Sequence, residues 1–486
     1  MRHENLPAHE CCSPVTRREF LVRSGGGFGA LAASWMLHHH GSLALAKTAS
    51  GAAGDPLASR PPHFAPRAKR VIYLFMHGGP SHVDLFDPKP ELRRLAVQPL
   101  PESFGAVMTR RKVAANPLLA PICKFERHGT SGLEISELLP EMAKLADDMC
   151  VIRSCHGDSV NHPQSVYQMN TGSILMGRPS LGSWVSYGLG TENQNMPSFV
   201  VLPDPGGGIK GGPPAWGSGY LPATYQGTTM RPGKAPILHL APPAGVETDD
   251  QLAVLRYLQE ENEEHRALRQ MDDQLSARIN SYELAFRMQA EAPQLVDFSR
   301  ESPDTLKMYG VGEKHNDEFG TRCLLARRLL ESGVRFVQLY AGDTVGWDAH
   351  EDVAENHARM CRRTDKPIAA LLRDLQQRGL WDDTLVVWGG EFGRMPMSES
   401  GKGRDHNPWG YSVVLGGGAV KGGMVYGSTD EVGLRAADNP VHIRDLHATL
   451  LHVLGLNHEE LTYFHNGLDE RLTGTTPASV IHDILA

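Results

Sequence analysis

The sequence predicts an α/β fold in which helices cover both faces of a mainly parallel sheet. Short runs rich in β-branched and aromatic residues alternate with longer segments that carry apolar residues at helical spacing. Of the 486 residues, 41% are hydrophobic and 21% are charged, which is ordinary for a globular protein. The 51 glycines and 33 prolines indicate many loops, where α/β proteins carry their functional residues.

The expected strands and helices follow one another in this alternating order. Strands are expected at 70–76, 150–154, 199–202, 335–340, 384–388 and 411–415. Helices are expected at 318–332, 357–378 and 443–454, and one long helix at 249–292 carries a leucine and isoleucine stripe. A Gly/Pro-rich stretch at 204–237 precedes this long helix, so an insertion is expected at about 204–300.

The first residues are typical of a twin-arginine export signal. Arg17 and Arg18 precede a weakly apolar stretch at 21–45, and small residues at 44–46 fit a cleavage site. A buried N-terminal helix is the alternative, but the glycines at 25–27 disfavour it. The twin-arginine translocon is therefore an expected partner, and the mature protein is expected to be periplasmic or extracellular.

This interpretation divides the chain into four parts. They are the signal at 1–46, a linker at 47–68, one large domain at 69–475 and a tail at 476–486. No later apolar run is long enough to cross a bilayer, so no transmembrane anchor is expected in the mature form. The net charge of −8 argues against a nucleic-acid partner. The five cysteines of the mature chain predict either buried free thiols or one bridge, for example between Cys150 and Cys155.

Acidic and histidine side chains follow four of the expected strands. Because ligands of parallel sheets bind beyond the carboxyl ends of the strands, we expect these residues to share one edge. Mixed carboxylate and imidazole groups suit zinc or manganese, and calcium where more oxygens take part. The predicted metal ligands are Asp84, Asp348, His350, Glu391, Asp405 and His406.

Three segments of the chain resemble the alkaline phosphatase and sulfatase superfamily, over about 70–473. They are a strand ending in Gly-Gly-Glu-Phe-Gly at 384–393, a histidine followed by a strand and a glycine turn at 406–418, and a helix with Asp-x-x-x-Thr-Leu-Leu at 441–451. The resemblance implies an alkaline-phosphatase-like fold and a divalent-metal site. Glu391 stands where the superfamily has a metal-binding Asp-His-Gly.

Longer motifs identify the chain as a member of the exported family called domain of unknown function 1501. They are Gly-Gly-Pro-Ser at 78–81 with Asp84, then 86–90, 346–350, 389–394 and 403–406. The name of this family implies no activity.

The chain departs from the superfamily at the nucleophile. The superfamily has Ser, Thr or oxidised Cys about ten residues before a Thr-Gly pair, and here His162 stands ten residues before Gly172. We predict that His162 is a nucleophile or general base, with a metal-ligand role and simple packing as alternatives. Ser165, three residues later, is a weaker candidate for the nucleophile.

Two classes of function fit these observations. The first is a metal-dependent hydrolase of sulfate or phosphate esters, in which Arg394 and Lys402 hold the anionic group of a small ester or of a sulfated or phosphorylated polymer. The second is a binding or structural member that kept the fold and lost the nucleophile. Other metal chemistry is a third alternative.

Overall fold

The structure is a computed structural model. It describes residues 56–486 except 234–235, 238–239, 241–244, 246–247, 269–272 and 343–344. The predicted signal at 1–46 lies outside the described residues. From Leu57, which is buried, the predicted linker packs on the domain, and the Arg60 amide donates to the Leu189 carbonyl over 2.9 Å.

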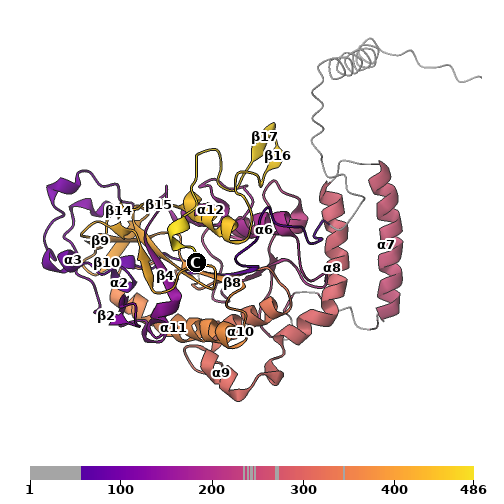
Figure 1. The fold of residues 1–486 in the computed structure, drawn as a ribbon, viewed down its shortest axis with the longest axis horizontal. Helices are drawn as coiled ribbons and strands as arrows, with labels where there is room; N and C mark the ends of the chain where they lie inside the picture. The colour runs from indigo at the N-terminus through magenta and orange to yellow at the C-terminus, as the bar shows by residue number, and fades with distance from the viewer. Residues whose placement is uncertain are drawn as a thin grey trace, which may run out of the picture. The chain divides into compact units, whose positions relative to one another are not determined.

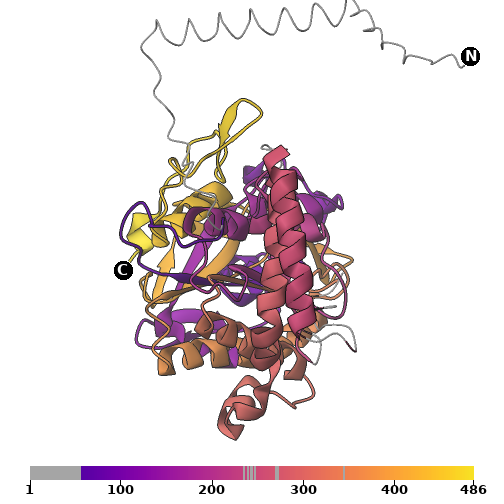
Figure 2. The same cartoon turned by 90° about the vertical axis from the view of Figure 1, so that its right-hand side faces the viewer.

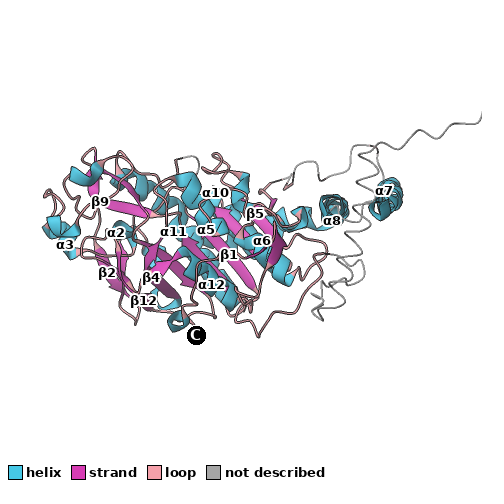
Figure 3. Ribbon diagram, turned by 90° about the horizontal axis from the view of Figure 1, so that it is seen from above, coloured by secondary structure: helices cyan, strands magenta, loops and turns pink. Residues whose placement is uncertain are grey.

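One large sheet forms the centre of the described chain (Figure 3). Its order is β12-β4-β11-β8-β1-β7-β5-β6, and β15 pairs with β4. Neighbouring strands are parallel except β11, which runs antiparallel to β4 and β8, so the predicted mainly parallel sheet is confirmed. The strands are β1 (Arg70–Phe75), β4 (Met149–His156), β5 (Phe199–Leu202), β6 (Thr228–Thr229), β7 (Phe336–Tyr340), β8 (Thr384–Gly389), β11 (Tyr411–Gly416), β12 (Met424–Tyr426) and β15 (Val441–His442).

The two faces of the sheet bury two separate hydrophobic cores. In the central strand β1, Ile72 and Leu74 enter the core that contains Leu324 of α10 (Asp317–Glu331) and Leu371 of α11 (Val353–Gln377). The alternate residues of β1 enter the other core, under α5 (His162–Thr171), α6 (Leu181–Leu189) and α12 (Ile443–Val453). Side chains alternate along a strand, so a nearly all-apolar strand such as β1 requires helices on both faces (Figure 1).

Helices α11 and α5 differ from the sequence prediction. Helix α11 begins at Val353 rather than at 357, because the Asp352 side chain caps it by accepting from the Glu355 amide over 3.0 Å. Helix α5 was not predicted. Its second residue is Pro163, which is favourable in a first helical turn, and Gly172 ends it with a left-handed φ of 74°.

The predicted insertion consists of two long helices rather than one. They are α7 (Thr248–Leu268) and α8 (Asp273–Val296), which lie side by side (Figure 2). Met288 and Ala292 of α8 are buried in the core beside α10. The smaller elements are α2 (His82–Leu85), α3 (Pro90–Arg94), α4 (Pro140–Ala143), α9 (Pro303–Tyr309), β2 (Phe125–His128), β3 (Leu133–Ser136), β9 (Gly393–Glu399), β10 (Gly403–Asn407), β13 (Ser428–Thr429), β14 (Ala436–Asp438), β16 (Tyr463–His465) and β17 (Leu468–Glu470).

The end of the chain belongs to the domain. Ile481, Ile484 and Leu485 of the predicted tail are buried in the core under α12, and Leu485 bridges to Val420. The cysteines of the described chain are all free and buried, as the free-thiol alternative predicts. None of the helices in the described part is both long enough and apolar enough to span a membrane.

Candidate metal centre

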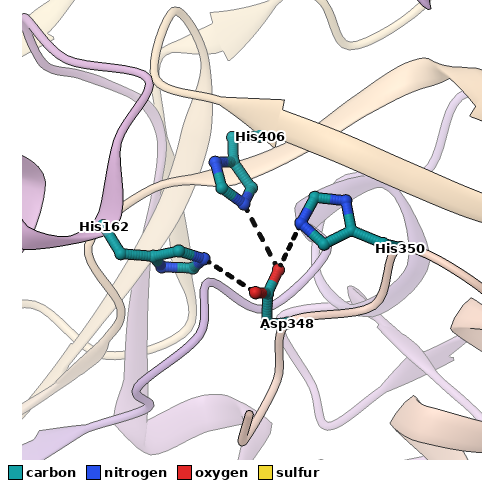
Figure 4. A group of neighbouring side chains, drawn as sticks. All are labelled: His162, Asp348, His350 and His406. Atoms are coloured by element: carbon teal, nitrogen blue, oxygen red, sulfur yellow. Dashed lines mark hydrogen bonds and ion pairs between the residues drawn. The ribbon is translucent and has the colours of Figure 1, made fainter. Parts of the chain in front are cut away.

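Three histidines meet one aspartate beyond the carboxyl ends of the strands. His162 is the first residue of α5, which follows β4, whereas Asp348 and His350 follow β7. His406 lies in β10, which pairs with β9 outside the main sheet. The ligand atoms of these four side chains lie within 4.8 Å of one another (Figure 4).

The Asp348 carboxylate stands at the centre of this three-histidine cluster. One of its oxygens, Oδ2, lies 3.0 Å from Nε2 of His162. The other, Oδ1, lies 2.9 Å from Nε2 of His350 and 3.3 Å from Nε2 of His406. The Nε2 atoms of His162 and His350 are buried and have no hydrogen-bond partner of good geometry among the described residues. Both nitrogens are thus within reach of the carboxylate without being satisfied by it.

The opposite ring nitrogen of each histidine faces an acceptor. His162 Nδ1 lies 2.6 Å from Glu391 Oε1, and His350 Nδ1 lies 2.5 Å from Glu399 Oε2. His406 Nδ1 lies 2.6 Å from the Val160 carbonyl. A carboxylate or a carbonyl can only accept, so Nδ1 carries the proton in each ring.

With its proton on Nδ1, a neutral imidazole presents the lone pair of Nε2 to Asp348. Burial lowers the pKa of His406 well below its usual value, so this ring is neutral near pH 7. Unprotonated nitrogens and a carboxylate cannot bond one another, and a cation between them would satisfy all of them. Metal-binding histidines typically donate their second nitrogen to a carboxylate or carbonyl. The residues therefore fit a divalent metal ion, with three imidazoles and one carboxylate as ligands.

Two cationic side chains also contact Asp348. Arg394 Nη2 lies 2.8 Å from Oδ1, and Lys210 Nζ lies 2.6 Å from Oδ2. Burial alone would raise the pKa of Asp348, whereas the charge of the buried Arg394 guanidinium lowers it, and the net direction is below the usual range. Asp348 is therefore ionised and available as a ligand.

Arg394 is buried and committed to the protein. Its guanidinium donates to the Gly79 carbonyl over 2.9 Å, to the Arg404 carbonyl over 3.1 Å and to the Gly78 carbonyl. From the sequence we expected Arg394 to bind the anionic group of the ester. In the structure it instead fixes the loop after β1 and orients Asp348. Lys402, the other predicted anion contact, is 75% exposed, and its nearest acidic oxygen, in Asp352, is 3.9 Å away.

Lys210 was missed by the sequence analysis. Its backbone amide donates to His77 Nε2 over 3.0 Å, which places its side chain at the cluster. Lys210 follows the Gly206–Gly208 run, inside the stretch at 204–237 that the sequence marked only as Gly/Pro-rich. Because this run comes after β5, the same strand-end argument that found Asp348 could have found Lys210.

Glu391 supports His162 rather than standing among the four central residues. Its two oxygens accept from the Gly78 amide over 2.9 and 3.1 Å, and one also faces His162. A side chain at Gly78 would lie 2.5 Å from the backbone nitrogen of Asp348, so only glycine allows this approach. Burial would raise the pKa of Glu391, but His162 and His77 outweigh it and keep this pKa low. Glu391, together with His77 and His162, forms a second group of side chains whose ligand atoms lie close enough to hold a metal ion.

Asp405 also contacts the three-histidine cluster without being one of its four residues. Its oxygens accept from the His406 amide over 2.8 Å and from the Arg111 amide over 2.7 Å. It forms a third group with His350 and Glu399. Glu399 had no sequence signal, because it lies at the end of a strand that is not part of the main sheet.

Asp84 lies outside these groups of described residues. Its carboxylate pairs with buried Arg404, with Nε 2.9 Å away, and accepts from the Ser81 hydroxyl and the Ile122 amide. Donors therefore surround Asp84, and we correct the expectation of a ligand here to that of a structural ion pair.

A cavity of about 570 Å³ opens beside the cluster. Asp348 and His350 are among the residues that line it. Its walls come from three parts of the chain, namely Arg111, then Val345 with Ala349, Glu351, Asp352, Glu355, Asn356 and Arg359, and finally Glu399 with Ser400. Solvent and a small ligand can therefore reach the predicted ligands.

Residues 68–485 match the model of the family described as "Protein of unknown function (DUF1501)". The chain belongs to this family. No curated protein matches the DUF1501 chain in sequence at a significant level.

Several solved structures are similar to this DUF1501 protein at low identity. The lipoteichoic acid synthase LtaP from Listeria monocytogenes is 11% identical with a TM-score of 0.35, over 87% of this chain and 79% of that one. The PsFucS1 sulfatase from Pseudoalteromonas sp. is 12% identical with a TM-score of 0.35, over 84% and 73%. The alkaline phosphatase from the Antarctic bacterium TAB5 is 10% identical with a TM-score of 0.33, over 81% and 100%.

Proposed function

We propose that this protein is a divalent-metal-dependent hydrolase of sulfate or phosphate esters. The observation that supports this function best is the convergence of three Nε2 atoms on the Asp348 carboxylate, with every Nδ1 held by an acceptor. The cavity beside these atoms gives a substrate access to them.

The ligand set favours zinc, and manganese after it. Three imidazoles and one carboxylate are typical of zinc, whereas calcium prefers six to eight oxygens. When bound, such a cation would polarise the ester and lower the pKa of a water molecule. Glu391 and Glu399 would keep the imidazoles of His162 and His350 in the tautomer that a metal requires.

Of the roles open to His162, we propose that of a metal ligand. Its Nδ1 faces Glu391 and its Nε2 faces Asp348, so the ring has the orientation of its two partners His350 and His406. Ser165 does not replace it as a nucleophile, because its hydroxyl donates to the Ser159 carbonyl over 2.7 Å. Hydrolysis would then need no covalent intermediate on the protein.

The side chains that remain for the anionic ester are Lys210 and Arg111. The Lys210 side chain is 29% exposed, and the Arg111 side chain is 49% exposed on the cavity wall. Arg394 would act through Asp348, since it is wholly buried.

Metal analysis and turnover on the mature protein test this function. We expect about one zinc or manganese ion per chain after reconstitution, and turnover on a panel of aryl sulfate, phosphomonoester and phosphodiester substrates that EDTA abolishes. His162→Ala should lose metal and turnover together. A His162→Ala protein that keeps both would contradict the ligand role, and wild-type protein without metal would contradict the proposed function.

The second candidate is a non-catalytic binding protein. It is favoured by one observation, that a histidine replaces the hydroxyl or thiol nucleophile at the start of α5. A metal-replete protein that is inactive on the whole panel would establish this alternative.

We further propose export by the twin-arginine translocon. Arg17→Lys with Arg18→Lys should leave the precursor in the cytoplasm, because the translocon recognises the arginine pair. Arg2→Lys is the matched control, and it should be exported normally. Normal export of the double variant would show that the signal is of another kind.

A further inference from the structure

A loop at residues 104–112, here called the arginine loop, is fixed at its base. Arg435 donates from Nη1 to the Phe104 carbonyl and from Nη2 to the Ala106 carbonyl, both over 3.0 Å. Trp409 Nε1 contacts the Met108 carbonyl over 3.4 Å. The loop is therefore positioned by side chains from the far end of the sequence before any ligand binds.

The tip of the arginine loop reaches residues next to the cluster. Arg110 Nε donates over 2.8 Å to Oδ1 of Asn161, the residue before His162. The Arg111 amide donates over 2.7 Å to Asp405, the residue before His406. Arg111 Nε lies 3.6 Å from Glu399, which holds His350. The loop thus places two guanidinium groups at the edge of the proposed reaction site.

Both guanidinium groups keep donors for a ligand. The contacts described for the side chains of Arg110 and Arg111 use Nε alone, and both side chains are exposed. Arg111 lines the cavity directly. A planar guanidinium presents two parallel N–H groups that match the oxygens of sulfate or phosphate.

A second part of the cavity lining, here called the α11 wall, carries acceptors. It is formed by the start of α11 and the residues before it, with the carboxylates of Glu351, Asp352 and Glu355 and the guanidinium of Arg359. Because three carboxylates outnumber one guanidinium, the α11 wall is net negative. It therefore repels anions and accepts hydrogen bonds from hydroxyl groups.

We propose that the substrate is a carbohydrate with more than one anionic ester group, and that Arg110 and Arg111 bind a group other than the one that is cleaved. The hydroxyl groups of the sugar would face the carboxylates of the α11 wall. This inference rests on the proposed function for the cleaved ester, but the recognition itself is a binding property. Sulfate and phosphate share this chemistry, and the choice between them is experimental.

Calorimetric binding to the zinc-reconstituted mature protein tests the proposal. The probes are dextran sulfate, dextran phosphate and neutral dextran of equal length. We expect at least one charged dextran to bind and neutral dextran to bind much more weakly. Arg110→Gln with Arg111→Gln should weaken the charged probe about tenfold or more, because charge-assisted hydrogen bonds are lost. The dependence of this affinity on salt should also become shallower.

A matched control removes two positive charges at the other edge of the sheet. Lys69 pairs with Asp383 before β8, and Lys421 Nζ contacts the Asp483 carbonyl. Lys69→Gln with Lys421→Gln should leave the affinity within about twofold, since exposed charges contribute little at a distance. Equal losses in the two double variants would overturn the inference, because net charge alone would then explain binding.

A second pair of substitutions acts in the opposite direction. Glu351→Gln with Glu355→Gln should tighten the charged dextran, because the repelling wall loses two negative charges. Unchanged affinity in the arginine double variant overturns the inference even if small esters are hydrolysed. Binding that depends on the arginines without any ester turnover supports recognition and contradicts the hydrolase, so the two failures are distinguishable.

Discussion

Asp84 is a buried carboxylate and Asp348 is a largely buried one. Each pairs with a wholly buried arginine, and they differ in their other neighbours. Around Asp84, the Ser81 hydroxyl, the Ile122 amide and Arg404 all donate. Around Asp348, two cationic side chains donate, and the Nε2 atoms of three imidazoles lie within 3.3 Å of its oxygens.

The comparison teaches what distinguishes a structural acid from a metal ligand. Burial alone would raise the pKa of Asp84, but Arg404 and the hydrogen bonds outweigh it and keep the group ionised. Donors satisfy Asp84 as it stands, whereas we propose that a cation joins Asp348 to the imidazoles around it. Burial and a nearby arginine are common to both sites, so neither indicates a metal.

The largest effect is expected at the structural ion pair. Asp84→Ala should lower the free energy of unfolding by about 3–5 kcal/mol, because Arg404 would be left buried and unpaired. Urea denaturation of the metal-free protein measures this change. Asp383→Ala breaks the exposed pair with Lys69 and should cost at most about 1 kcal/mol. Loss of metal in the Asp84→Ala protein, with stability unchanged, would break the comparison.

The next effect is expected at a predicted ligand. His350→Ala should lower zinc affinity by about a hundredfold or more, since structural zinc sites bind with roughly 10–16 kcal/mol shared among four ligands. The free energy of unfolding of the metal-free protein should stay within about 1 kcal/mol of the wild-type value, because the substitution removes only one of the three imidazoles around Asp348. Zinc titration and urea denaturation check both parts. His357 is a buried histidine outside the cluster. His357→Ala should therefore keep the wild-type zinc affinity and lower the free energy of unfolding of the metal-free protein.

A smaller effect is expected at Glu399, which contacts the predicted ligand His350. Glu399→Gln should lower zinc affinity by about ten- to a hundredfold, because the amide holds the His350 tautomer less firmly. Glu351→Gln is the control on the cavity wall, and its zinc affinity should be unchanged. Equal zinc affinities of the wild type and Glu399→Gln would mean that this contact does not orient the ligand.

The last effect is a pH dependence near Asp84, which is small near pH 7. The His357 ring accepts from the Ser81 amide over 2.8 Å, and Asp84, Arg394 and Arg404 act on its charge. Burial is the main cause that lowers the pKa of His357 to about 3. The unfolded chain therefore takes up this proton first, so the contribution of His357 to stability is complete above about pH 6.5 and lost as pH falls toward 3.

Urea denaturation of the metal-free protein at pH 7 and below measures this dependence. One such histidine gives at most about 1.4 kcal/mol per pH unit below 6.5. His357→Gln, which can still accept from the Ser81 amide, should remove this share of the slope. An unchanged slope in that variant would place the titration on other groups.

The sequence by itself determined the sheet and the edge that carries the site. The apolar runs of β1, β4, β5, β7, β8 and β11 lie within a residue or two of their predicted positions. Parallel strands end at a common edge, so their positions predicted that His162, Asp348 and His350 come together, whereas His406 reaches them from β10, outside the main sheet. The insertion was also visible, although its division into α7 and α8 was not.

Only the tertiary structure decided which acids face the cluster. Arg404, which completes Asp84, lies 320 positions away in the sequence, and Glu399 reaches His350 from a separate two-stranded sheet. Lys210 depends on an irregular loop held by His77. Residue type and strand position show that a side chain is near the edge of the sheet. Contacts between distant segments decide which groups then surround that side chain. Those contacts form only when the chain packs, and they separate a buried ion pair from a metal ligand.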